Sequence, residues 1–148
     1  MNKYYFTNQT IDRAKAREIE LKVESMTDLV LENPFYDGDA KEVRQLDGTG
    51  KTGLTHDEIV GADLRKIRES KGIVAYMSSD RNIGSAMEIA IASFSWGKPV
   101  YIICEPSMVH IKNHPWIKYF GISVFDSVYE FIKYAKEHLV NENTKIHS

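Results

Sequence analysis

Residues 78–104 decide the fold and read SSDRNIGSAMEIAIASFSWGKPVYIIC. Residues 83–97 predict a helix that is apolar nearly all round and whose one ionisable side chain is Glu88. Such a helix is expected to be buried on most faces, and a carboxylate in it must be paired, hydrogen-bonded or needed for function. We expect Glu88 in or near the first helical turn, where free N–H groups and the helix dipole favour an anion.

Two interpretations of Glu88 stay open on the residues alone. In one, the carboxylate has a structural role, capping its own helix or pairing with a buried arginine. In the other, it serves a ligand site, and its position favours this. The helix follows an apolar strand expected at residues 72–77, so it begins at the carboxyl edge of a parallel sheet, where α/β proteins bind ligands.

Strands and helices alternate along the whole chain. Strands are expected at residues 4–7, 28–31, 72–77, 99–104 and 122–125, and helices at residues 10–26, 55–70, 83–97, 113–120 and 127–139. A capping box of Thr55 and Glu58 marks the beginning of the second helix. This order predicts a single α/β domain over residues 1–140, followed by a polar tail at 141–148. Its fold class is flavodoxin-like, or Rossmann-like: a five-stranded parallel sheet in the order 2-1-3-4-5 with helices on both faces.

Composition excludes several classes of function. The chain has 148 residues and a net charge of −2, which gives no electrostatic footprint for nucleic acid. No apolar run approaches the roughly 20 residues that cross a membrane. A single cysteine, Cys104, allows no intramolecular disulfide and fits a reducing cytoplasm, where we expect the protein. The five histidines lack metal-ligand spacing, so no metal is expected. The chain also lacks a Gly-rich phosphate fingerprint, and no other cofactor is expected.

In this strand order the switch point lies between the first and third strands, so the ends of those strands are expected to form the pocket. Five residues in or near these strands remain as candidates for chemistry. They are Tyr5 in the first strand, Asp63 on the helix before the third strand, Asp80 and Asn82 after that strand, and Glu88. Asp63 either is an ordinary surface charge or pairs functionally with Glu88. Two carboxylates in one site suit the cleavage of glycosidic bonds, because one attacks carbon while the other manages protons.

The sequence resembles the nucleoside 2-deoxyribosyltransferases and the related 2′-deoxynucleoside 5′-phosphate N-hydrolases over about residues 3–104. The matching segments are YYFT at 4–7, ADLRKI at 62–67, GSAMEIAIA at 84–92 and GKPV at 97–100. By this resemblance, Glu88 attacks the anomeric carbon of deoxyribose and holds a covalent glycosyl-enzyme intermediate. Tyr5 orients the Glu88 carboxylate, and Asp63 contacts the base and manages the proton on its leaving nitrogen.

The resemblance implies transfer of 2-deoxyribose between nucleobases with net retention. Two alternatives are kept: a hydrolase that cuts the N-glycosidic bond of 2′-deoxynucleoside 5′-monophosphates, and a non-catalytic sensor of nucleotides or ADP-ribose on the same fold. The expected partners are therefore nucleosides or nucleotides and free nucleobases, without nucleic acid or membrane. A homo-oligomer is also implied, with a segment near Asn113 closing the sugar pocket of a neighbouring subunit.

The sequence departs from the family pattern in two places. The first strand continues as Thr7-Asn8-Gln9, where the family usually has Ala-Gly-Pro-Phe. Asn82 stands where the transferases commonly have Asp and the phosphate-recognising hydrolases have Ser, and Asp80 is an alternative for that position.

Further substrate contacts are expected from the helix that follows these residues and from a long excursion at residues 34–54. Gly84 and Ser85 lie at the beginning of the helix, where a sugar hydroxyl or a phosphate would both be accepted. Phe35, with Tyr36, either covers the base by stacking or only pins the excursion in place.

Overall fold

The computed structural model describes residues 2–35, 55–79 and 81–140. Its centre is a parallel sheet of β1 (Lys3–Asn8), β2 (Val30–Glu32), β3 (Ile73–Met77), β4 (Val100–Cys104) and β5 (Ser123–Phe125). The strand order is β2-β1-β3-β4-β5, with every pair parallel. The predicted fold class and strand order are thus confirmed. The predicted tail, Asp80, Tyr36 and most of the excursion lie outside the described residues.

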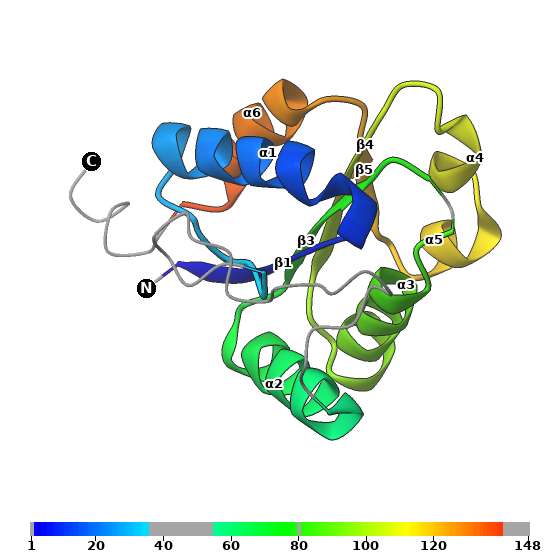
Figure 1. The fold of residues 1–148 in the computed structure, drawn as a ribbon. Coiled ribbons are helices and arrows are strands. Elements are labelled where there is room, and N and C mark those ends of the chain that lie inside the picture. The colour runs from blue at the N-terminus through cyan, green and yellow to red at the C-terminus, as the bar shows by residue number, and fades with distance from the viewer. Residues whose placement is uncertain (1, 36–54, 80, 141–148) are drawn as a thin grey trace.

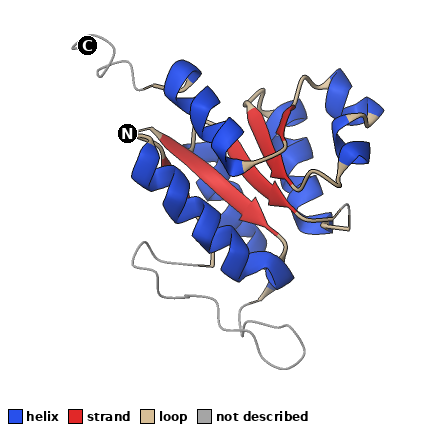
Figure 2. Cartoon of the chain, turned by 90° about the horizontal axis from the view of Figure 1, so that it is seen from above, coloured by secondary structure: helices blue, strands red, loops and turns tan. Residues whose placement is uncertain are grey.

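Helices cover both faces of the sheet, as predicted (Figures 1 and 2). The helical segments are η1 (Thr10–Asp12), α1 (Arg13–Met26), α2 (His56–Glu69), α3 (Ile83–Ala90), the π-helical η2 (Ile91–Ser95), α4 (Val109–Lys112), α5 (Pro115–Tyr119) and α6 (Val128–His138). The capping box at Thr55 is confirmed, since Thr55 Oγ1 accepts from the Glu58 N–H at 3.1 Å. No helix among the described residues is long and apolar enough to span a membrane.

Alternation along β1 sends neighbouring side chains into two separate cores. Tyr4 and Phe6 belong to the core beneath α1 and α6, whereas Tyr5 belongs to the core beneath α2 and α3. Because strand side chains alternate with a period of two, Thr7 lies on the same face as Tyr5. Tyr5 and Thr7 therefore both point to the helix that contains Glu88.

The topology opens a crevice between the ends of β1 and β3. These two strands are hydrogen-bonded neighbours, with Thr7 opposite Ala75 and Asn8 opposite Tyr76. After β1 the chain turns to α1 on one face, and after β3 it turns to α3 on the other (Figure 1). Such a reversal leaves the carboxyl ends of the two strands uncovered by helices, which creates a site for a ligand.

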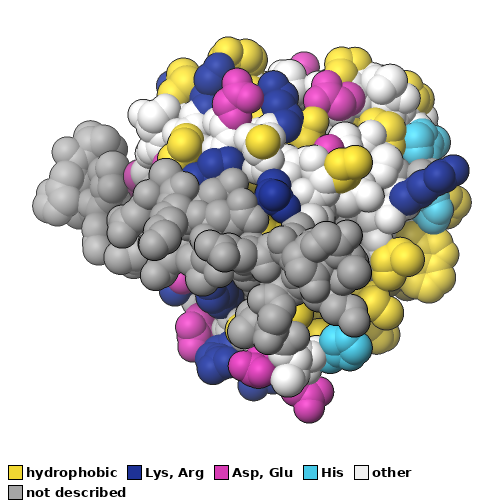
Figure 3. Space-filling view, viewed as in Figure 1, with side chains coloured by type: hydrophobic (Ala, Val, Ile, Leu, Met, Phe, Trp, Pro, Cys, Tyr) yellow, Lys and Arg dark blue, Asp and Glu magenta, His cyan; other side chains and the backbone are white. Residues whose placement is uncertain are grey.

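The prediction that the Glu88 helix is buried on most faces is wrong. Ile83, Met87 and Phe94 are 74%, 64% and 75% exposed, while Ser85 and Ile89 are buried. The sheet covers only one side of α3 and η2, so the opposite apolar side faces outward. Figure 3 shows hydrophobic side chains gathered on this side of the molecule, beside α3 and α5.

Glu88 lies near the first helical turn and not in it. Asn82 is the N-cap of α3, and Ile83 is the first helical residue. Glu88 is consequently the sixth residue of the helix and lies in its second turn, beyond the free N–H groups of the terminus. The capping hypothesis for Glu88 therefore fails, because Asn82 performs that task.

Candidate active site

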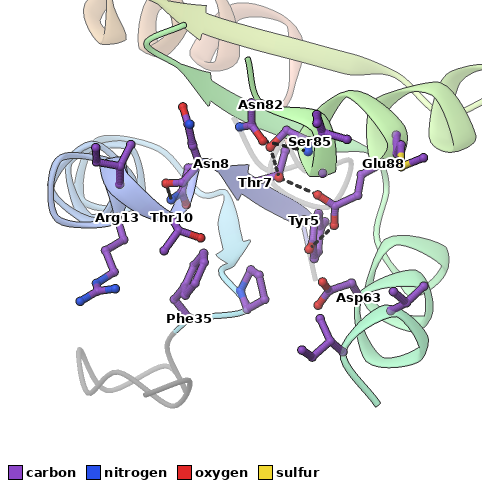
Figure 4. A pocket seen from close by; sticks show the side chains of 18 of the residues that line it. Tyr5, Thr7, Asn8, Thr10, Arg13, Phe35, Asp63, Asn82, Ser85 and Glu88 are labelled. Carbon is purple, nitrogen blue, oxygen red and sulfur yellow. Dashed lines mark hydrogen bonds between the residues drawn. The ribbon is translucent and has the colours of Figure 1, made fainter. Parts of the chain in front are cut away.

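A pocket of about 1000 Å³ lies at the carboxyl edge of the sheet, between α1, α2 and α3. It includes most of the residues predicted for the site. The predicted residues that line it are Tyr5, Phe35, Asp63, Asn82, Gly84, Ser85 and Glu88. Their assembly from β1, the segment after β2, α2 and α3 agrees with the predicted position of the pocket. Figure 4 shows Asp63 and Glu88 both pointing into this space.

Glu88 is half-buried, and each of its carboxylate oxygens accepts a hydrogen bond from a hydroxyl of β1. Tyr5 Oη donates to Glu88 Oε2 at 2.5 Å, and Thr7 Oγ1 donates to Glu88 Oε1 at 2.7 Å. Tyr5 itself is 1% exposed and fixed in the core. The arginine buried within the described residues, Arg17, pairs with Glu20 on the other face of the sheet. The carboxylate of Glu88 is thus oriented by rigid elements and opens toward the pocket.

The loop after β3 is tied to the end of β1, which keeps α3 in register with Tyr5 and Thr7. Ser79 Oγ donates to Gln9 Oε1 at 3.2 Å, and Ser78 Oγ donates to the Asp12 carboxylate. Asn82 Oδ1 then accepts from the backbone N–H of Ser85 at 3.1 Å. A polar loop followed by an Asx N-cap is a local signal that the sequence provides.

Asp63 lies on the half-buried side of α2. Ile67, one turn later in the same helix, is fully buried and joins the core beneath α2 and α3. Lys98 Nζ donates a hydrogen bond to the carbonyl of Arg68 at 2.9 Å, which holds the end of α2 in place. Asp63 lines the same pocket as Glu88, and its role as the functional partner of that carboxylate stays a prediction.

Phe35 is a buried apolar residue that lines the pocket. A network of polar side chains that begins in α1 holds its backbone in place. Its backbone N–H donates to Asn33 Oδ1 at 2.9 Å, and Asn33 Nδ2 donates to Glu20 Oε2 at 2.9 Å. Glu20 also accepts from Arg17 at 2.6 Å. Burial raises the pKa of Glu20 to about 7, against the opposing effects of Asn33 and Arg17.

Sequence reasoning missed several polar residues that line the pocket, namely Thr7, Asn8, Arg13 and Arg81. Asn8 and Asn82 are only 8% and 7% exposed, and within the described residues Asn8 Oδ1 and Asn82 Nδ2 have no hydrogen-bond partner. The spacing of Tyr5 and Thr7 was a usable signal, because residues two apart in a strand share a face.

Asn113 does not line this pocket. It is exposed, and its Nδ2 donates to the Val109 carbonyl at 3.2 Å, between α4 and α5. The expected contribution of Asn113 runs through a neighbouring subunit, so it stays a prediction. Within the described ranges, no group of three or more His, Cys, Asp or Glu side chains is arranged to hold a metal ion.

Comparison with known proteins gives a fold and no closer assignment. No family model and no curated protein matches the chain. Among solved structures, a conserved protein from Enterococcus faecalis V583 aligns with a TM-score of 0.63 at 16% identity, covering 93% of this chain and 98% of that one. A 2-deoxyribosyltransferase from Leishmania mexicana aligns with a TM-score of 0.61 at 17% identity, covering 93% of this chain and 99% of that one.

These alignments cover nearly the whole of each chain, so the entire domain is shared and not merely its sheet. The chain therefore has the α/β fold of a 2-deoxyribosyltransferase. This confirms at the level of the fold the resemblance that the sequence motifs indicate.

Proposed function

We propose that this chain is a nucleoside 2-deoxyribosyltransferase that acts by double displacement through Glu88. The observation that supports it most is the Glu88 carboxylate, held on both oxygens by Tyr5 and Thr7 and open to a pocket that Asp63 also lines. A nucleophilic carboxylate needs a fixed orientation and an exposed face, and a second carboxyl group is needed for protons.

In the first step, an oxygen of Glu88 bonds to the anomeric carbon while the bond from that carbon to the base nitrogen breaks. The electron pair of the broken bond goes to the base, and the carboxyl group of Asp63, acting as general acid, donates a proton to it. The base leaves neutral, and the sugar remains as an ester of Glu88. Protonating the leaving group matters because negative charge develops on the base as the sugar becomes oxocarbenium-like.

In the second step, a nitrogen of another base attacks the anomeric carbon from the opposite side. The bond to Glu88 breaks, its electron pair returns to the carboxylate, and Asp63 takes the proton that the incoming nitrogen loses. Two inversions give net retention at the anomeric carbon. Phe35 supplies a flat apolar surface in the pocket against which either base can stack.

A base-exchange assay tests this proposal. Wild-type protein incubated with deoxyadenosine and free cytosine is expected to form deoxycytidine and adenine. Glu88→Ala is expected to form neither, and added formate, which replaces the missing carboxylate, is expected to restore part of the turnover. A Glu88→Gln protein with wild-type turnover on every deoxynucleoside would overturn the proposal, and ligand binding without turnover would indicate a sensor.

A second candidate is the hydrolysis of 2′-deoxynucleoside 5′-monophosphates, favoured by one specific observation. Arg13 and Arg81 both line the pocket, and guanidinium groups bind phosphate oxygens in bidentate geometry. Water would then replace the second base, and Asp63 would take its proton. Release of free base from deoxynucleoside monophosphates alone would support hydrolysis. Glu88→Ala should abolish this release, and Arg13→Gln should raise the KM for the monophosphate.

A further inference from the structure

We propose that Thr7 is a positioning residue for the nucleophile, whose hydroxyl fixes Glu88 and stabilises the carboxylate as the glycosyl bond to it breaks. This inference rests on the proposed function, and it assigns a distinct task to a residue outside the predicted site. Its basis is the contact of Thr7 Oγ1 with Glu88 Oε1 at 2.7 Å and with Ser85 Oγ at 2.6 Å.

The protons in this chain of hydroxyls have one consistent arrangement when Glu88 is ionised. An ionised carboxylate only accepts hydrogen bonds, so the single proton of the Thr7 hydroxyl must point to Glu88. Ser85 must then donate its own proton to Thr7 Oγ1, since a hydroxyl has one proton and two lone pairs. The result is a directed relay from Ser85 through Thr7 to the carboxylate.

Both ends of the relay are fixed by rigid elements. Thr7 and Ser85 are buried at 3% and 2% exposure. Thr7 lies in β1, which pairs with β3 at this position. The backbone N–H of Ser85 is held by the Asn82 cap at 3.1 Å. The relay is therefore organised before a substrate arrives, which is the condition under which an electrostatic donor contributes most to a reaction.

Thr7 adds something that Tyr5 alone does not supply. A single donor on Oε2 leaves the carboxylate able to turn about its terminal bond, because that torsion is broad. Donors on both oxygens fix the plane of the carboxylate and hence the direction of the lone pair that attacks.

The charge on Glu88 changes in opposite directions in the two steps. It is lost when the ester forms and returns when the bond between the anomeric carbon and the Glu88 oxygen breaks. A hydroxyl donor binds the charged form more strongly than an ester, so Thr7 should favour the second step. Removing a hydrogen bond to a charged group costs about 10- to 100-fold in rate.

The experiment compares wild-type protein with Thr7→Val, which removes the hydroxyl, and Thr7→Ser, which keeps it. Thr27→Val is the matched control. The Thr27 hydroxyl is also hydrogen-bonded, donating to the backbone carbonyl of Val23 at 2.7 Å, but it does not line the pocket. The measurements are kcat and KM for base exchange and, by intact mass after rapid quenching, the fraction of protein that holds the sugar. Circular dichroism checks folding, and Thr7→Ala replaces Thr7→Val if the latter does not fold.

Thr7→Val is expected to lower kcat about 10- to 100-fold, with KM unchanged or lower and more covalent intermediate. Thr7→Ser should recover most of the turnover, and Thr27→Val should match the wild type. A Thr7→Val protein with wild-type kinetics, a Thr7→Ser protein as slow as Thr7→Val, or a loss confined to KM would overturn the role of Thr7 alone. A wild-type protein without turnover would overturn the proposed function and this inference together.

Discussion

Glu88 and Glu20 are both withdrawn from solvent, on opposite faces of the same sheet, and they are held in different ways. Glu88 is half-buried in α3, accepts hydrogen bonds from the hydroxyls of Tyr5 and Thr7, and borders a pocket of about 1000 Å³. Glu20 is 1% exposed in α1 and is enclosed by the Arg17 guanidinium and the Asn33 amide.

The difference between the two sites indicates what each carboxylate is for. Hydroxyls orient an anion without cancelling its charge, so an electrophile in the pocket can still be attacked. A guanidinium at 2.6 Å and full enclosure leave no approach for a substrate, and such a pair acts through packing and specificity of structure. We therefore expect substitutions at Glu88 to change turnover and substitutions at Glu20 to change stability.

The largest effect is expected from exchanging each carboxylate for its amide. Glu88→Gln should lower kcat for base exchange by at least about 10³-fold, because an amide is a poor nucleophile. Glu20→Gln should retain turnover within a few-fold, since it does not line the pocket. Steady-state kinetics on both proteins is the measurement, and a comparable loss in the two would remove the functional distinction between them.

Asp63→Asn is expected to show the next largest loss, about 10²-fold in kcat, because an amide cannot deliver a proton to the leaving base. The loss should shrink for nucleosides whose base is more acidic and leaves without help, such as 5-fluorouracil compared with uracil. The measurement is kcat across a series of leaving bases. If the loss is equal for all leaving bases, Asp63 binds the substrate and does not transfer the proton to the leaving base.

Tyr5→Phe tests whether a hydroxyl donor to Glu88 contributes to turnover. It removes the donor at 2.5 Å from Oε2 and keeps the buried ring, so kcat should fall about 10- to 100-fold with little change in melting temperature. Tyr4→Phe is a control on the neighbouring residue of β1, whose ring packs in the opposite core. If both variants lose turnover equally, a general effect of removing a tyrosine hydroxyl from β1, and not the hydrogen bond to Glu88, is responsible.

The sequence predicted the fold because its signals were local and repeated. Five apolar strands alternated with helices, and the capping box at Thr55 and the apolar run of β4 appear where they were expected. The candidate site followed from topology, since strand ends at the switch point must meet. The burial of the Glu88 helix could not be predicted, because it depends on which side of the helix the rest of the fold covers. Nothing in the run from Ile83 to Phe94 distinguishes an outward apolar face from a buried one.

The same limit explains why Thr7 and Glu20 were missed as important polar residues. Their partners, Glu88 and Asn33, are 81 and 13 residues away in the sequence. A threonine in a strand and a glutamate in an amphipathic helix are individually ordinary. Only tertiary packing reveals that the one bonds to the candidate nucleophile and the other is enclosed.

The smallest effect on turnover, and a distinct effect on stability, is expected from the pH dependence of Glu20. Burial raises its pKa to about 7 from an ordinary value of 4.5, with Glu24 adding to the rise and Asn33 and Arg17 opposing it. Between these two pH values the folded protein binds a proton that the unfolded chain has lost. The free energy of unfolding should therefore fall as pH rises through this window, by roughly 3 kcal/mol.

Denaturant unfolding of wild-type protein and Glu20→Gln at pH 5 and pH 8 measures this contribution. Because glutamine does not titrate, the stability of Glu20→Gln relative to the wild type should increase from pH 5 to pH 8. Glu18→Gln, on the exposed side of the same helix, is the matched control and should leave the wild-type pH dependence in place. A wild-type protein that instead gains stability relative to Glu20→Gln as pH rises would mean that attraction to Arg17 outweighs burial. Glu20 would then be a charge that the folded state stabilises, and its enclosure would still separate it from Glu88, which borders the pocket.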